Sequence, residues 1–145
     1  MSAFLLDVNV LIALMWPAHD SHNKVLDWFG RHERAGWATC PVTQAGFVRI
    51  VTNIAFSADA VTPQEAIKIL QANCGHSSHH FWSDEISIFD AVQSFRQRLT
   101  SHRQITDAYL LGLVLHKKGR LATLDRSILS LVPESSGDRE SIVVI

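Results

Sequence analysis

Short apolar runs alternate along the chain with longer stretches of helical periodicity, and this alternation predicts strands and helices in turn. The apolar runs of strand length lie at residues 2–6, 37–40, 79–83, 121–124 and 141–145. Strands that alternate with helices of about 10–15 residues form a parallel or mostly parallel sheet with helices on both faces. We therefore predict one α/β domain over residues 1–145, with no second domain.

Capping residues and breakers predict where the helices begin and end. The predicted helices are 8–16, stopped by Pro17; one capped by Asp20 or Ser21 and closed by Gly36; one capped by Thr43; one from Thr62 to about Asn73; 86–100; and one capped by Thr106 that ends at 117–119. Thr62, Pro63 and Glu65 form a capping box, which makes the start of the fourth helix the best defined. Residues 133–140 are predicted to be a polar loop.

Three aspartates each stand at the end of an apolar run, where a charge is costly unless it is needed. Asp7 and Asp125 follow predicted strands, while Asp107 and Gln44 lie in the first turns of predicted helices. All four side chains can therefore reach the carboxyl end of the sheet, where α/β proteins bind ligands. Two carboxylates at 4 Å repel by about 4 kcal/mol at an effective dielectric of about 20, so the group requires a cation.

With oxygen ligands alone, the predicted cation is Mg²⁺ or Mn²⁺, which can position and activate a water for attack on a phosphodiester. Each acid also has a purely structural interpretation. Asp7 and Asp125 can cap the helices that follow them, and Asp107 can interact with a helix dipole. The joint placement of the three acids favours the metal site.

The overall charge and the cysteines restrict the class of protein. The net charge of −1 excludes a wholly basic surface, so nucleic acid would bind a local patch, such as the basic stretch from Arg96 to Arg126. Solvated helix ends are the alternative interpretation of that stretch. Isolated Cys40 and Cys74 and the absence of an N-terminal signal predict a cytoplasmic protein with reduced thiols. No apolar run approaches the roughly 20 residues that cross a membrane.

Two other features carry less weight. The segment CGHSSHH at residues 74–80 lacks a second ligand pair at zinc-finger spacing, so zinc is disfavoured. The four tryptophans can stack on bases, but their helical and strand contexts favour packing in the core or a dimer: Trp16, Trp28, Trp37 and Trp82.

Four segments together resemble the PIN-domain ribonuclease toxins of the VapC type, over essentially the whole chain. They are LLDVNVLIAL, CPVTQAGFVRIVTN, HFWSD and ITDAYLLGLVLHKKGRLATLDRSI. The resemblance implies a three-layer α/β/α sandwich with a mostly parallel central sheet. It also implies cleavage of RNA with Mg²⁺ or Mn²⁺, a homodimer, and a VapB-type antitoxin as partner.

The same resemblance implies roles for individual residues. Asp7, Asp107 and Asp125 correspond to the catalytic metal ligands, and the polar neighbours that would orient ligands or substrate are Asn9, Thr106 and Arg126. Members of the family usually carry an acid where this chain has Gln44, which can take part only through its amide, for example by holding a water. The alternative to an active enzyme is a silent PIN domain that binds RNA or an antitoxin.

Overall fold

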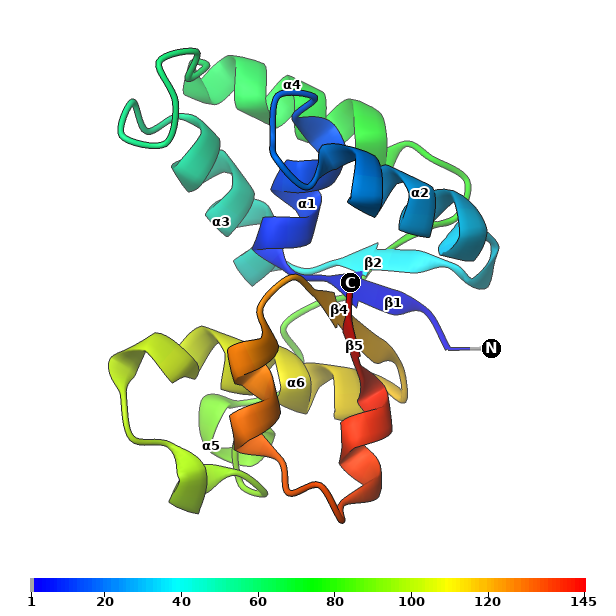
Figure 1. Cartoon of the computed structure of the whole chain (residues 1–145), viewed down its shortest axis with the longest axis vertical. Coiled ribbons are helices and arrows are strands. Elements are labelled where there is room, and N and C mark those ends of the chain that lie inside the picture. Colours follow the sequence, from blue (N-terminus) through cyan, green and yellow to red (C-terminus); the bar gives the residue numbers. More distant parts are fainter. Residues whose placement is uncertain (1) are drawn as a thin grey trace.

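A parallel sheet forms the centre of the computed structural model, which describes residues 2–145 (Figure 1). Within those residues the sheet has five strands in the order β3-β2-β1-β4-β5. The strands are β1 (Phe4–Leu6), β2 (Trp37–Thr39), β3 (His79–Phe81), β4 (Arg120–Thr123) and β5 (Ile142–Val144). Because β1 pairs with both β2 and β4, its carboxyl end lies at the middle of the sheet edge.

Helices cover both faces of this sheet, as Figure 1 shows. One layer contains α1 (Val8–Met15), α2 (His22–His32), α3 (Pro41–Val51) and α4 (Pro63–Cys74), and the other contains α5 (Ile88–Ala91) and α6 (Ile105–Lys117). Among residues 2–145, every helix is too short or too polar to cross a membrane. The predicted α/β/α sandwich is therefore confirmed, and the pairings between its strands are all parallel.

Alternate residues of β1 face opposite cores, as expected for a strand buried on both sides. Phe4 and Leu6 pack with Phe47 of α3 in one core, whereas Leu5 packs with Leu111 of α6 in the other. Of the four tryptophans, Trp28, Trp37 and Trp82 are buried, and Trp16 contacts Phe56 edge to face with ring centroids 5.5 Å apart. Their predicted role in packing is confirmed.

The starts of two helices differ from the prediction. The box of Thr62 and Glu65 does begin α4, but α3 begins at Pro41, and Thr43 is its third residue. Pro41 already has the φ angle of a first helical residue, so the hydroxyl of Thr43 instead accepts the backbone N–H of Cys40 at 3.0 Å. Thr43 therefore stabilises the start of α3 from inside the helix.

Thr106 was likewise predicted to cap α6, which proves wrong. A 3₁₀ turn, His102–Gln104, precedes α6, and the side chains of Ser101 and Gln104 form the box that caps this turn. The helix therefore begins at Ile105 and places Asp107 as its third residue. At the other end Lys118 adopts a left-handed φ of 56° and terminates the helix.

The predicted helix over residues 86–100 is also wrong, since only Ile88–Ala91 is α-helical and Arg96–Arg98 forms a 3₁₀ turn. The cause is a tertiary contact. The carbonyl of Ala91 packs directly on α6, where a Cβ added to Gly112 would lie 2.1 Å from the Ala91 oxygen. Phe95 donates its N–H to Val92 rather than to Ala91, so the helical ladder ends there. The predicted polar loop at 133–140 similarly contains part of a 3₁₀ turn, Gly137–Ser141.

Candidate functional site

Asp7 lies where β1 ends and α1 begins, and its side chain is only 6% exposed. One carboxylate oxygen, Oδ1, accepts the backbone N–H of Val8 at 2.7 Å, and Oδ2 accepts the hydroxyl of Thr123 at 2.7 Å. Burial raises the pKa of Asp7, the two hydrogen bonds lower it, and the charge of Asp125 raises it further. A buried carboxylate is thus held in a fixed orientation at the central strand.

Thr123, at the end of β4, connects Asp7 to the rest of this edge. Its oxygen accepts the backbone N–H of Asp125 at 3.1 Å and faces the amide nitrogen of Asn9 at 3.4 Å. The amide oxygen of Asn9 in turn accepts the N–H of Leu124 at 3.1 Å. Asn9 therefore joins α1 to the loop after β4, and its role in orienting ligands or substrate stays a prediction.

Asp125 and Arg126 are both exposed on that loop. The Oδ1 atom of Asp125 accepts the N–H of Ser127 at 2.9 Å and so caps the 3₁₀ segment Arg126–Leu131. The prediction that Asp125 can cap the segment after it is confirmed for one of its two carboxylate oxygens. Its second oxygen remains for another partner, because among residues 2–145 no hydrogen bond to that atom is formed.

Asp107 is half-buried in the first turn of α6, and its pKa is raised to about 6. Burial is the largest cause, followed by the charges of Asp7 and Asp125. The three aspartates are therefore close enough for the charges of Asp7 and Asp125 to disfavour ionisation of Asp107. Neighbouring Thr106 is exposed and lines a pocket together with Val8 of α1 and Arg49 of α3.

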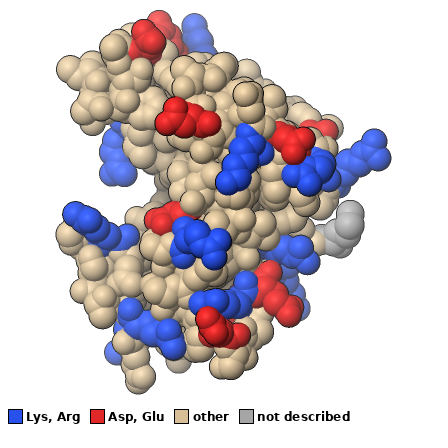
Figure 2. Space-filling view, viewed as in Figure 1, with Lys and Arg blue, Asp and Glu red and all other residues tan. Residues whose placement is uncertain are grey.

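The surface around this edge is hollowed. Figure 2 shows a notch between the two helical layers, with an acidic side chain beside it and basic side chains on either side. As the side chains are placed, no three His, Cys, Asp or Glu residues among residues 2–145 form a group that could hold a metal ion. One oxygen of Asp7 and one of Asp125 already accept backbone N–H groups, so a shared ion would require these carboxylates to reorient.

Gln44 occupies the first turn of α3, the helix that follows β2, and β2 is next to β1 in the sheet. Its amide nitrogen donates to the hydroxyl of buried Thr39, at the end of β2, over 3.0 Å. Neither Glu65 nor Glu85 is free to supply an acid in place of Gln44. Glu65 is committed to its capping box, and Glu85 pairs with His116 and Lys117 at 3.3 Å each.

Two residues of this edge, Thr123 and Thr39, were not identified from the sequence. Both are buried threonines at the last position of a strand, a pattern that ordinary β-propensity also produces. The only distinguishing signal is a threonine two residues before Asp125 at the end of an apolar run.

The raised pKa values predict how stability depends on pH in the metal-free protein. Between pH 3.8 and about pH 6, Asp107 keeps its proton in the folded protein but has released it in the unfolded chain. The free energy of unfolding therefore falls as the pH rises through this range. From about pH 4.5 to about pH 7.5, the melting temperature of Asp107→Asn should therefore fall by less than that of the wild type. Scanning calorimetry of both proteins without metal measures this, and an identical pH dependence would contradict it.

Comparison with known proteins places this geometry in a family. Residues 4–133 match the PIN domain. The chain is 40% identical over 124 residues to Ribonuclease VapC39 of Mycobacterium tuberculosis. The aligned segment covers 86% of this chain and 89% of that protein. It is 42% identical over 131 residues to Ribonuclease VapC44 of the same organism, covering 89% and 91%.

Solved structures agree in fold. PAE2754 from Pyrobaculum aerophilum superimposes with a TM-score of 0.60 at 21% identity, over 90% of this chain and 80% of that one. VapBC2 from Rickettsia felis, bound to a DNA fragment from its promoter, gives a TM-score of 0.61 at 10% identity, over 99% and 97%. From the sequence matches, this chain belongs to the PIN domain family and, within it, to the VapC proteins.

Proposed function

We propose that this protein is a divalent-metal-dependent endoribonuclease and the toxin of a VapBC-type toxin–antitoxin pair. The observation that carries the proposal is the proximity of Asp7, Asp107 and Asp125 at the carboxyl end of the sheet, where the charges of Asp7 and Asp125 raise the pKa of Asp107 and that of Asp125 raises the pKa of Asp7. The relatives named as ribonucleases support RNA as the substrate.

The donor set at this edge fits a hard divalent cation such as Mg²⁺ or Mn²⁺, because it consists of carboxylate oxygens that repel one another. When bound, such an ion would neutralise these charges, activate a water and stabilise charge on the reacting phosphate. Asp7, Asp107 and Asp125 are the residues that would hold it. Thr123 and the N–H of Val8 keep Asp7 in place, and Asn9 fastens the loop that carries Asp125.

RNA would approach along the notch that Figure 2 shows. Arg126 adjoins Asp125 in the chain, and Arg49 lines the pocket beside Thr106. Both arginines can pair with phosphate oxygens and so position the RNA backbone without reading its sequence. Arg49 lies on α3 and Arg126 follows β4, so the two arginines would contact the RNA from different elements.

Incubation of antitoxin-free protein with total RNA tests the proposal. We expect cleavage with Mn²⁺ and none when a chelator replaces the metal. The alternative function, a silent PIN domain that binds RNA or an antitoxin, is favoured by the amide at position 44. RNA that is bound, by gel shift, but never cut in Mn²⁺ would establish that alternative.

Gln44→Glu should tighten Mn²⁺ binding, because it restores the fourth negative charge that most members of the family carry. Because one added carboxylate attracts the ion only moderately more strongly, we expect the dissociation constant for Mn²⁺ to fall roughly tenfold. Titration calorimetry measures it, with Gln64→Glu on the exposed start of α4 as the matched control. An unchanged dissociation constant for Gln44→Glu would show that this side chain does not face the ion.

The partners follow from the same proposal. The similar structure from Rickettsia felis is that of VapBC2, and we infer that this chain also binds a VapB-type antitoxin and forms a homodimer. Light scattering of the purified chain, alone and mixed with a candidate VapB-type antitoxin, would give the stoichiometry of the homodimer and of the complex. A monomer that the antitoxin neither binds nor inhibits would contradict this part of the proposal.

A further inference from the structure

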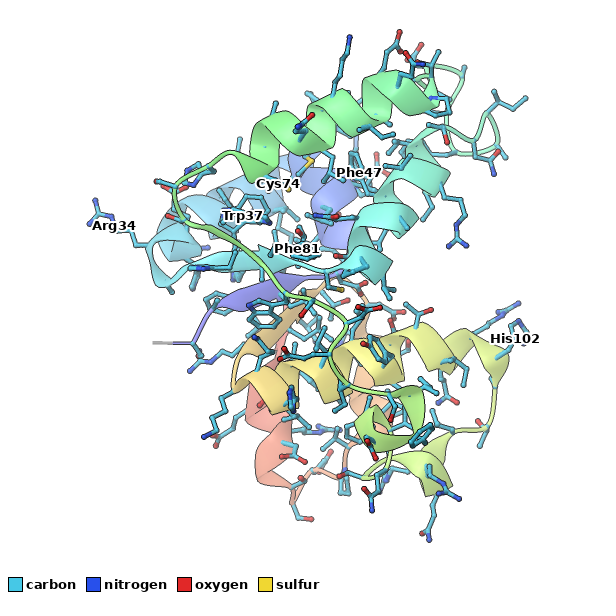
Figure 3. The ribbon with its side chains drawn as sticks, turned by 180° about the vertical axis from the view of Figure 1, so that it is seen from behind. Arg34, Trp37, Phe47, Cys74, Phe81 and His102 are labelled. Atoms are coloured by element: carbon cyan, nitrogen blue, oxygen red, sulfur yellow. The ribbon has the colours of Figure 1, made fainter. Side chains whose placement is uncertain are left out.

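The hydroxyl of Thr39 joins two side chains that lie on different elements. Its oxygen is 3.0 Å from the amide nitrogen of Gln44 on α3 and 2.8 Å from Nε2 of His79 on β3. Thr39 is fully buried, and the ring of His79 lies against that of Trp37, with centroids 4.6 Å apart. Figure 3 shows Trp37 and Cys74 in this region, between the sheet and α4.

The hydrogen atoms in this chain of contacts can be assigned from its geometry. A threonine hydroxyl has one proton to give, and a neutral histidine donates through one ring nitrogen and accepts through the other. The Cys74 backbone raises the pKa of the His79 ring, as an acceptor beside a ring N–H does, and since Nε2 faces Thr39, Nδ1 is the nitrogen left to face Cys74. A neutral ring that carries its proton on Nδ1, toward Cys74, accepts the proton of Thr39 at Nε2.

The charges around His79 agree with a neutral ring. Burial is the main effect and lowers its pKa, the hydrogen bond from the ring to the Cys74 backbone raises it, and neighbouring His80 lowers it. The Cys74 thiol, 4.0 Å from the Thr39 hydroxyl, has a pKa raised by burial, so it adds no negative charge at neutral pH.

Once the proton of Thr39 is given to His79, its oxygen can only accept from Gln44. The amide must then turn its nitrogen toward Thr39, and the orientation of an amide is otherwise free to reverse. Among residues 2–145, the amide oxygen of Gln44 has no hydrogen-bond partner. That oxygen is the atom left available at the carboxyl end of the sheet.

We propose that Thr39 and His79 are positioning residues that fix the amide of Gln44, so that its oxygen rather than its nitrogen serves the acidic site. The inference rests on the proposed function, since an amide oxygen at the acidic site can help to bind a cation, whereas an NH₂ group in its place would repel it. It also explains how a neutral side chain can stand where the family has an acid. A freely reversing amide would present the wrong atom part of the time.

Histidine tautomers in the metal-free protein test the proposal directly. Long-range ¹H–¹⁵N spectra of the wild-type protein should show His79 neutral and protonated on Nδ1 at neutral pH. In Gln44→Glu the new carboxylate only accepts, so it takes the Thr39 proton. We then expect His79 either to gain a proton, with its pKa raised by about one unit or more, or to move its proton to Nε2.

The charge added by Gln44→Glu could also act on His79 through space rather than through the hydroxyl of Thr39. To separate the two effects, Gln44→Glu is repeated in a Thr39→Val background, which has the same shape without the hydroxyl. There the response of His79 should fall to less than about half. Thr39→Ser, which keeps the hydroxyl, should retain the wild-type tautomer, and exposed His76 should be unaffected throughout. A wild-type ring protonated on Nε2, or equal responses in the two backgrounds, would overturn the proposal.

Mn²⁺ titration links this arrangement to the site. Thr39→Val should weaken binding about tenfold, the lower end of the range for groups that orient metal ligands, and Thr39→Ser should restore it. Equal affinities for wild type and Thr39→Val would overturn the positioning role. Absence of Mn²⁺ binding by the wild type would instead contradict the proposed function, and the tautomer spectra would still decide the hydrogen-bond direction.

Discussion

Asp7→Asn should lower the rate of RNA cleavage by at least about 100-fold. Groups that merely orient the ligands of a metal cost about 10–100-fold when removed, and a direct ligand should cost no less. The fold should survive, because asparagine has the same shape and its amide oxygen can still accept one of the two hydrogen bonds that Asp7 accepts, from the N–H of Val8 or from the hydroxyl of Thr123. Loss of a buried charge whose pKa burial raises should leave the melting temperature unchanged or slightly higher.

The measurement is the initial rate of cleavage in Mn²⁺, with thermal melting of the same samples. Asp59→Asn, an exposed change in the loop between α3 and α4, is the matched control and should cleave as the wild type does. Equal cleavage by Asp7→Asn and wild type would mean that the activity belongs to a contaminant or to another site.

The largest effect on stability is expected from Gly112→Ala. A Cβ at this position would lie 2.1 Å from the oxygen and 2.6 Å from the carbonyl carbon of Ala91, and both atoms are backbone that cannot rotate away. Overpacking of this kind costs about 3 kcal/mol, which lowers the melting temperature by about 6–12 °C in a domain of this size.

Gly30→Ala supplies the contrast within the same protein. Gly30 is a residue of α2, and a Cβ there meets nothing within 4 Å. Alanine should therefore stabilise the helix by up to about 1 kcal/mol. Thermal melting of both variants tests the pair. A Gly112→Ala protein as stable as the wild type would show that the end of α5 does not pack on α6.

The elements that could be predicted from the sequence are those whose cause is local. Apolar runs followed by acids predicted β1 and β4. Thr62 and Glu65, three residues apart, predicted the start of α4. The end of α5 could not be predicted, because it depends on Ala91 meeting Gly112 of a helix that comes later in the chain. The missed caps of α3 and α6 reflect residues, Pro41 and Ser101, whose effect takes precedence over the nearby threonines.

The site divides in the same way. The ends of β1 and β4 and the first turn of α6 place Asp7, Asp125 and Asp107 near one another, as the sequence predicted, and their roles as metal ligands stay predictions. The contacts of Thr39 with His79 and of Thr123 with Asp7 depend on which strands are neighbours in the sheet. Strand order is not encoded in any short segment, so these partners could not be found in advance.

The bond between Thr123 and Asp7 spans 116 residues of sequence, which has a consequence for how activity arises during folding. Contacts this distant form late, because a long loop must close before they are made. On the ribosome, β1 can pair with β2 early, but the acids cannot assemble until β4 and Asp125 have emerged. A nascent or partly refolded chain should therefore be harmless to RNA, and in refolding experiments cleavage should return only with the final cooperative step.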